Sequence, residues 1–144
     1  MLVLLFVFFC ACSTSEKASE KEFLEFSKPM GFNETDLAYS LKIDPSGKVV
    51  IKGDENSPKQ GRYKADLPES AGKALWQRIA DIDFEPFRLE YGMEAEDSQT
   101  KTIRYALKSK SGTIRYKSRA PRELKELEQA FDALVRISLK ENDE

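Results

Sequence analysis

The most constraining feature of this sequence is an alternation of apolar and polar side chains, with a period of two residues, that recurs in several short stretches after residue 36. This period places the apolar side chains on one face of a β-strand and the polar ones on the other. The apolar members of these stretches are Leu37, Tyr39, Leu41 and Ile43; Val49 and Ile51; Tyr63, Ala65 and Leu67; Ile103, Tyr105 and Leu107; and Ile114 and Tyr116. With a short first strand expected over residues 23–28, the pattern predicts one antiparallel sheet of about five to six strands, buried on one face.

Turn residues indicate how the strands connect. Asp44-Pro45-Ser46-Gly47 has the composition of a type I turn, with Asp at the first position and Pro presetting φ at the second. Lys110-Ser111-Gly112 is expected to form the turn of a second hairpin, in which Gly112 supplies a positive φ.

Two segments have the periodicity of amphipathic helices. Asp66-Leu67-Pro68-Glu69 resembles a capping box, and the helix it opens should end near Asp81. Its expected apolar stripe consists of Ala71, Leu75, Trp76 and Ile79. Pro121 should open the second helix, whose stripe consists of Leu124, Leu127, Phe131 and Leu134, with an extension to Ile137.

The order of these elements predicts the fold class. The chain reads as hairpin, strand and helix, followed by hairpin and helix. An α+β fold with both helices packed on one face of a single sheet buries both stripes. We therefore expect four aromatic residues in the core, namely Trp76, Phe84, Phe87 and Phe131.

The start of the chain predicts export and lipid attachment. Residues 1–12 are almost wholly apolar and carry no charged side chain. Twelve helical residues rise only about 18 Å, too little for a bilayer core of roughly 30 Å, whereas they match the apolar part of a signal peptide. Cys12 follows the small residue Ala11, as in a lipobox, so Cys12 is the expected lipidation site. A signal normally begins with a basic residue; we expect that the natural start lies upstream, the alternative being that the α-amino group serves alone.

The remaining chain divides into three parts. Residues 13–21 should form a flexible tether, residues 22–139 a single α+β domain, and residues 140–144 a polar tail. A buried strand or helix over residues 1–12 is the competing interpretation, and the polar tether makes it the weaker one.

A series of short motifs resembles a known family. The motifs are Tyr39-x-Leu41-x-Ile43, Gly47, Gly61-x-Tyr63, Tyr91, Asp97-x-x-Thr100, Gly112 and Pro121-x-x-Leu124-x-x-Leu127. Their order is similar to that in Bacteroidetes-type envelope lipoproteins known only as a domain of unknown function. The resemblance covers residues 23–137 and implies a fold and an envelope location, but no activity. The family often has a Cys-x-x-x-Cys-Pro element before the tyrosine. Here Phe32, Asp36 and Leu37 stand there, so any redox role of that element is absent.

The composition excludes several chemistries. The chain has no histidine, and its two cysteines stand at positions 10 and 12, within the apolar segment. Catalysis by Cys-His or Ser-His-Asp groups is therefore excluded, as is a zinc site built on His or Cys in the domain. The net charge of −2 gives no support for nucleic acid as a partner. We expect no cofactor.

Acidic residues dominate the stretch from Asp81 to Asp97. Glu94, Glu96 and Asp97 are weak candidates for a cation site, because they lack the spacing of an EF-hand. A solvated acidic loop is the preferred interpretation, since such charges are mostly exposed.

Basic residues dominate the next stretch, from Ser98 to Arg122, which contains no acid. Alternation should place Arg104, Lys108, Arg115 and Lys117 on the face of the second hairpin that points away from the core, and these four are the candidate anion-binding residues. The same alternation turns Lys42, Lys52, Arg62 and Lys64 outward. A face of one sign attracts anions, although lysines on an open sheet also serve simply to prevent edge aggregation.

Two functions follow as hypotheses. The first is a non-catalytic binding or structural module, lipid-anchored in the bacterial cell envelope at the outer membrane, with an anionic lipid, an acidic glycan or an acidic protein as partner. The second is a small carboxylate-dependent envelope hydrolase that acts on glycans. A pocket lined by two of the acids would favour the second.

Overall fold

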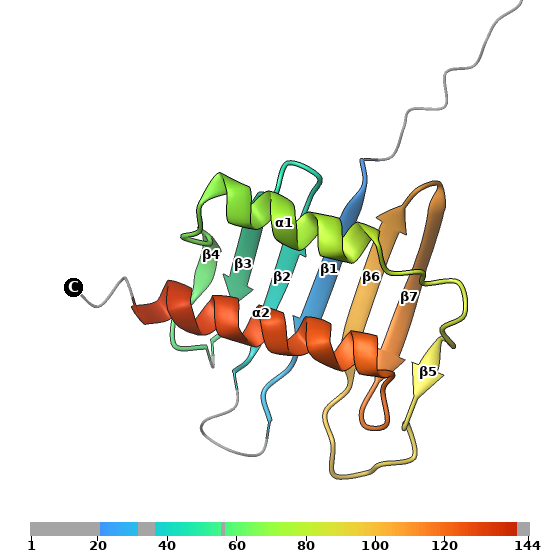
Figure 1. Cartoon of the computed structure of the whole chain (residues 1–144). Helices are drawn as coiled ribbons and strands as arrows, with labels where there is room; N and C mark the ends of the chain where they lie inside the picture. Colours follow the sequence, from blue (N-terminus) through green and yellow to red (C-terminus); the bar gives the residue numbers. More distant parts are fainter. Residues whose placement is uncertain (1–20, 32–36, 56, 141–144) are drawn as a thin grey trace, which may run out of the picture.

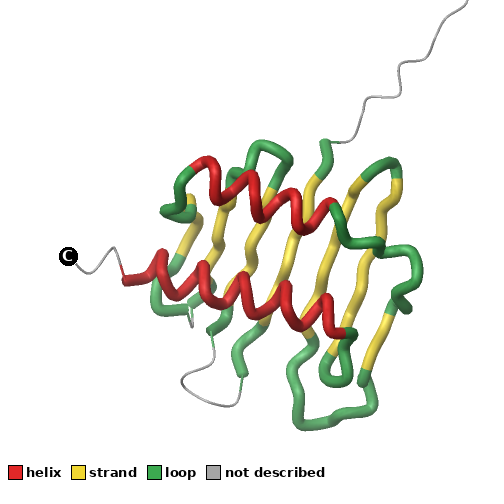
Figure 2. Tube along the Cα trace, in the orientation of Figure 1, coloured by secondary structure: helices red, strands yellow, loops and turns green. Residues whose placement is uncertain are grey.

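In the described part of the chain, one open sheet is covered on one face by two helices (Figures 1 and 2). The computed structural model describes residues 21–31, 37–55 and 57–140, so that Cys12, nearly all of the predicted tether (residues 13–20) and residues 141–144 lie outside the described part. The strands are β1 (Phe23–Lys28), β2 (Tyr39–Ile43), β3 (Val49–Gly53), β4 (Gly61–Lys64), β5 (Glu90–Tyr91), β6 (Lys101–Leu107) and β7 (Lys110–Tyr116). The helices are α1 (Glu69–Ala80) and α2 (Arg122–Lys140).

The α+β class and the two helices on one face are confirmed, but two details of the predicted sheet are wrong. The sheet has seven strands rather than five or six, in the order β4-β3-β2-β1-β6-β7-β5. It is also mixed rather than antiparallel, because β5 pairs with β7 in parallel while the other neighbours are antiparallel. β5 has only two residues, which is too short for a sequence period to reveal.

The first strand lies at the centre of the sheet. β1 spans the predicted residues and is hydrogen-bonded to β2 on one side and β6 on the other. Its inward residues Leu24 and Phe26 are fully buried. The two hairpins are therefore joined through β1, which makes one continuous sheet of the two halves of the chain.

The first hairpin turn is confirmed. Gly47 has a φ of +79°, its N–H donates to the carbonyl of Asp44 over 2.9 Å, and the Asp44 carboxylate accepts from the N–H of Ser46. This turn lies directly against α1, where a Cβ added to Gly72 would stand 2.1 Å from the Gly47 carbonyl oxygen. Glycine at both positions allows the two backbones to approach.

The second hairpin turn is displaced from its predicted position. Lys108 and Ser109 form it with φ values of 49° and 66°, as a two-residue turn of this kind requires. Gly112 lies instead within β7, opposite Tyr105. A Cβ at Gly112 would stand 2.8 Å from the Tyr105 hydroxyl oxygen, so this glycine makes room for a neighbouring ring.

The start of α1 also differs from the prediction. Pro68 is the N-cap residue, and no side chain caps the helix, so the capping box from Asp66 to Glu69 does not form. Glu69 pairs with Lys73 one turn on instead. Ala71 is exposed, and the buried residues of α1 are Gly72, Trp76 and Ile79.

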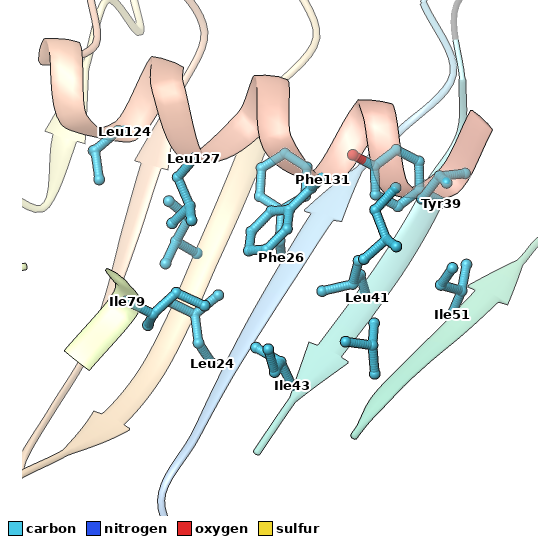
Figure 3. Packing of buried hydrophobic residues seen from close by; sticks show 14 of the residues in the cluster. Leu24, Phe26, Tyr39, Leu41, Ile43, Ile51, Ile79, Leu124, Leu127 and Phe131 are labelled. Carbon is cyan, nitrogen blue, oxygen red and sulfur yellow. The ribbon is translucent and has the colours of Figure 1, made fainter. Parts of the chain in front are cut away.

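The α2 stripe joins the helix layer to the centre of the sheet (Figure 3). Leu124, Leu127, Phe131 and Leu134 are buried as predicted, and the Phe131 ring packs on Phe26 with centroids 5.4 Å apart. The predicted extension to Ile137 is wrong, since that side chain is 54 % exposed and Val135 and Ser138 take the buried positions. Trp76 and Phe84 are buried, whereas Phe87 is partly buried with its ring edge against Phe84.

No helix within the described residues is both long enough and apolar enough to span a membrane.

We predict that Phe131→Ala lowers the free energy of unfolding by about 3–5 kcal/mol, because a fully buried ring is replaced by a cavity. Ile137→Ala, on the same helix but exposed, is the matched control and should change it by roughly 0.5 kcal/mol or less. Urea denaturation followed by circular dichroism measures both. Equal losses would contradict the placement of the α2 stripe.

Candidate functional site

The face of the sheet opposite the helices is covered by no other helix or strand in the described part of the chain (Figure 1). We call it the outer face. Six basic and two acidic side chains of the strands point to it, namely Lys42, Lys52, Arg62, Lys64, Arg104, Arg115, Glu25 and Glu90. The outer face is therefore markedly basic, although the whole chain carries a net charge of −2.

The strand register arranges part of this face into one line of side chains across six strands. Successive partners in the ladders are Arg62, Lys52, Ser40, Ser27, Thr102 and Arg115. We call this line the hydroxyl row. Its middle consists of three hydroxyl side chains, with two bases at one end and one base at the other.

The positive charge on the outer face is not evenly neutralised. Glu25 pairs with Arg104 over 3.0 Å, and Glu90 pairs with Arg115 over 3.1 Å. Among the described residues, no carboxylate forms an ion pair with Lys52 or Arg62. The uncompensated charge therefore lies over β3 and β4 rather than over the second hairpin.

A shallow depression of about 450 Å³ lies in this region of the outer face. It is lined by Glu25, Ser40, Leu41, Lys42, Val50, Lys52, Arg62 and Arg104. Lys42 also lies 4.6 Å from the ring centroid of Phe23, a cation–π contact that holds its ammonium group above the sheet. The depression thus presents four bases and one acid to solvent.

The four predicted anion-binding residues lie apart. Arg104 and Arg115 are on the outer face, each paired with a glutamate. Lys108 is a turn residue whose ammonium group donates to the carbonyl of Ala80, the last residue of α1, over 2.8 Å. Lys117 donates to the carbonyl of Ala95 in the acidic loop over 2.9 Å. Anion binding at these four stays a prediction, but the structure does not group them.

The predicted acidic loop contains the three weak candidates for a cation site. Within the described ranges, no group of three acidic or cysteine side chains is arranged to hold a metal ion, and this includes Glu94, Glu96 and Asp97. Glu94 pairs instead with Arg119 over 3.3 Å.

Two acids of the same stretch line a groove between the end of α1 and the start of α2. The groove has a volume of about 480 Å³ and is lined by the apolar residues Ile82, Pro86, Phe87 and Leu127, by the acids Asp81, Asp83, Glu123 and Glu126, and by Arg78. Three of these carboxylates are engaged: Asp81 with Gln77, Asp83 with the N–H of Glu85, and Glu126 with Arg122. Asp81, Asp83 and Glu123 are exposed. An acid catalyst near neutral pH needs a buried, desolvated carboxyl, which such exposed groups do not provide.

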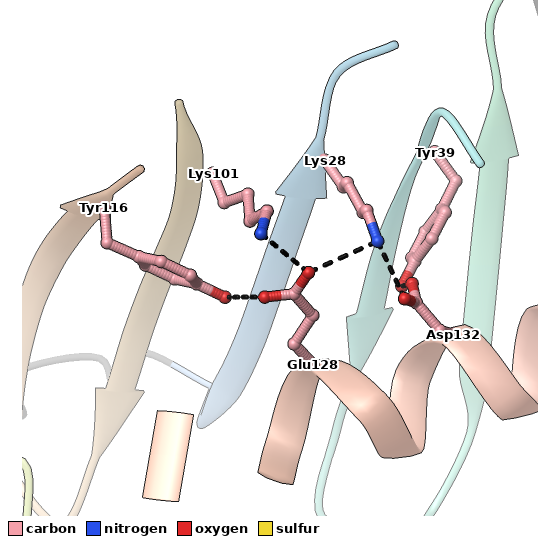
Figure 4. Close-up of polar contacts among 6 residues, drawn as sticks. All are labelled: Lys28, Tyr39, Lys101, Tyr116, Glu128 and Asp132. Atoms are coloured by element: carbon pink, nitrogen blue, oxygen red, sulfur yellow. Dashed lines mark hydrogen bonds and ion pairs between the residues drawn. The ribbon is translucent and has the colours of Figure 1, made fainter. Parts of the chain in front are cut away.

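A polar network that the sequence analysis missed lies on the helix side of the sheet (Figure 4). Its members are Lys28, Tyr39, Lys101, Tyr116, Glu128 and Asp132. The first four stand at inward positions of β1, β2, β6 and β7, and the two carboxylates lie one turn apart on α2. The sequence pattern could have revealed this network. The alternation of the strands places Lys28 and Lys101 at inward positions, where an unpaired charge is costly and a carboxylate partner is expected.

Each charge in this network has an opposite partner. The Lys28 ammonium lies 2.7 Å from Asp132 and 3.2 Å from Glu128, and Lys101 lies 2.9 Å from Glu128. The phenols of Tyr39 and Tyr116 donate to Asp132 and Glu128 over 2.7 and 2.9 Å. The side chains of Lys28 and Glu128 are only 16 % and 13 % exposed, so these bonds are screened little by water.

The protonation states of the network favour a structural role. Burial, and then the hydrogen bond to Asp132, raises the pKa of Tyr39 above its ordinary value of 10.0. Burial, and then the charge of Glu128, likewise raises the pKa of Tyr116. Burial alone would lower the pKa of Lys28, but the hydrogen bond and charge of Asp132, together with Glu128, outweigh it and raise that pKa. At neutral pH these three groups keep their protons, so none of them is a base.

We predict that the free energy of unfolding falls as pH rises above about 10. The unfolded chain releases its tyrosine and lysine protons near pH 10, whereas the raised pKa values of Tyr39, Tyr116 and Lys28 keep them in the folded state. The folded state then binds more protons than the unfolded chain. The stabilisation from these groups is therefore fully present below their ordinary pKa values, and it is lost as pH rises through their raised pKa values in the folded state.

Tyr39→Phe/Tyr116→Phe should flatten this alkaline loss, and it should lower stability near pH 7 by about 1.5–3 kcal/mol for each lost hydrogen bond to a carboxylate. Urea denaturation at a series of pH values measures both effects. Tyr105→Phe is the control, because the Tyr105 hydroxyl makes no hydrogen bond within the described residues. An alkaline loss of equal steepness in wild type and double variant would refute the assignment.

Sequence comparison relates the chain to a family. Residues 24–135, from β1 into α2, match the family described as Domain of unknown function (DUF6438). No curated protein matches the chain. The resemblance to a domain of unknown function is thereby confirmed, and the chain belongs to the DUF6438 family.

Proposed function

We propose that this protein is a lipid-anchored, non-catalytic module of the bacterial cell envelope, and that the outer face of its sheet binds an anionic ligand. The observation that carries the binding proposal is the depression over β2, β3 and β4, where Lys52 and Arg62 lack a carboxylate partner among the described residues. Two uncompensated cations beside a concave surface attract anions from solution, since the low-dielectric walls concentrate the field.

The location rests on the sequence. An uncharged apolar run, the small Ala11 before Cys12 and a polar stretch after it are typical of a lipoprotein signal and its tether. Cys12 lies outside the described residues. A lipid anchor at the outer membrane would hold the domain next to anionic headgroups and acidic surface polymers, within reach of the outer face.

A glycan hydrolase remains the alternative, but the groove between the helices supports it weakly. Such an enzyme needs two carboxylates, one of them with a raised pKa through burial. The groove is lined by Asp81 and Asp83, which are exposed and already hydrogen-bonded. The binding module is therefore the function that the geometry favours.

We predict that Cys12→Ser abolishes incorporation of a fatty-acid analogue and releases the protein from membranes, because Cys12 supplies the thiol that receives the diacylglycerol. Metabolic labelling and membrane fractionation in a Gram-negative host measure the two effects. Cys10→Ser is the control and should leave both unchanged. Labelling that persists in Cys12→Ser, or that depends on Cys10, would overturn the assignment.

We predict that Lys52→Glu/Arg62→Glu weakens binding to polyanions by roughly tenfold or more, since a base near an anionic surface contributes on the order of 1 kcal/mol. The probes are polygalacturonate and phosphatidylglycerol vesicles, and binding to them should weaken steeply with salt. The control Lys125→Glu/Arg136→Glu makes the same change of charge on exposed positions of α2. Equal binding by both double variants would show that net charge alone matters.

A further inference from the structure

We propose that the ligand of the outer face is an acidic polysaccharide, lying across the strands along the hydroxyl row. This inference rests on the proposed function and specifies the chemical class of its ligand. It follows from three properties of the row, namely its hydrogen-bonding groups, its length and the shape of the surface around it.

The hydrogen-bonding groups of the row match a sugar chain better than a simple anion. Ser27, Ser40 and Thr102 are half-buried between neighbouring strands, and their hydroxyl oxygens have no hydrogen-bond partner within the described residues. A hydroxyl both donates and accepts, whereas lysine and arginine only donate. A carboxylate or phosphate needs donors alone, but a sugar also offers hydroxyls that require acceptors. The row supplies acceptors in its middle and two cations without a carboxylate partner among the described residues at its β3–β4 end.

The length of the row fits an extended polymer. Neighbouring strands lie about 4.8 Å apart, so a line across six strands extends over about 24 Å. The two bases without a carboxylate partner among the described residues, Lys52 and Arg62, stand at one end on β3 and β4, whereas Arg115 at the other end on β7 is paired with Glu90. One polymer chain carrying repeated carboxylates and hydroxyls can contact these two bases and the three hydroxyls at once, and each later contact then forms at a high effective concentration.

The shape and composition of the surface disfavour a bilayer as the occupant. Binding by insertion needs apolar side chains that enter the boundary between headgroups and acyl chains. The large exposed apolar residues of the described part are Met30, Leu89 and Ile137, and none of them is in a strand. The bases around the depression line a hollow of about 450 Å³, which an extended polymer segment can occupy.

The experiment separates an acidic polysaccharide from other polyanions. Isothermal titration of the full-length chain would use polygalacturonate, polyglutamate as an acidic polymer without sugar hydroxyls, dextran as a neutral polysaccharide, and phosphatidylglycerol vesicles. We expect polygalacturonate to bind at least about tenfold tighter than polyglutamate at physiological salt, because each additional hydrogen bond contributes a factor of about five. Dextran should not bind measurably.

A variant of the hydroxyl row tests the assignment directly. Ser27→Ala/Ser40→Ala/Thr102→Val removes the hydroxyls and keeps every charge, so it should lower the affinity for polygalacturonate to that for polyglutamate and leave the latter unchanged. Ser111→Ala/Thr113→Val is the matched control, because it removes outward hydroxyls of β7 that lie outside the row. Thermal unfolding verifies that both variants are folded.

Three results would overturn the inference. Equal binding of polygalacturonate and polyglutamate, insensitive to the row variant, would indicate a general anion site or an acidic protein partner. Tightest binding to the vesicles would indicate a membrane surface. Either result would leave the proposed anion binding intact, whereas binding to none of the polyanions, even at low salt, would refute both proposals.

Discussion

The contact between Phe131 and Phe26 holds the two layers of this protein together at their centre. Phe26 lies on the central strand and Phe131 in the middle of α2, and both are fully buried. Because β1 joins the two hairpins, a helix anchored on β1 also covers the strands on either side of it. The apolar stripe of α1 packs beside it, and with both helices on one face, no described helix or strand covers the other face. The outer face is thus left uncovered because both helices pack on the opposite, apolar face of the sheet.

Basic side chains are in opposite situations on the two faces of the sheet. Lys28 and Lys101 point inward, where burial makes a lone charge costly, and both are paired with carboxylates of α2. Lys52 and Arg62 point outward, where water solvates them, and no described carboxylate pairs with them. A cation that is already neutralised can contribute little to a ligand, whereas an unpaired one remains available. The direction of a side chain in the pleat therefore separates structural cations from candidate binding ones.

Much of the fold could be predicted, and the errors have physical causes. The strands with a clear alternation and the α2 stripe are where the pattern places them. The reason is that the spacing of apolar residues in the sequence matches the spacing of side chains on the buried face of a strand or helix. β5 was missed because a two-residue strand has no period, and the second turn was misplaced because Gly112 was interpreted as a turn residue. In fact Lys108 and Ser109 adopt the positive φ values, and the glycine accommodates the Tyr105 ring. The network around Glu128 and Asp132 was missed because its members come from elements far apart in the chain.

The sequence by itself determined several local choices: which residues of the alternating strands face inward, where the first hairpin turns, which chemistries lack the necessary side chains, and that the strand faces opposite the core carry many bases. These properties depend on residues a few positions apart in the sequence, so they can be predicted without a structure. Only the tertiary structure decided which bases have partners. Arg104 is neutralised by Glu25 from β1 and Arg115 by Glu90 from β5, whereas the hydroxyl row arises from the register of six strands. Ion pairs and cross-strand register depend on which residues are close together in space. The order of residues along the chain does not specify this.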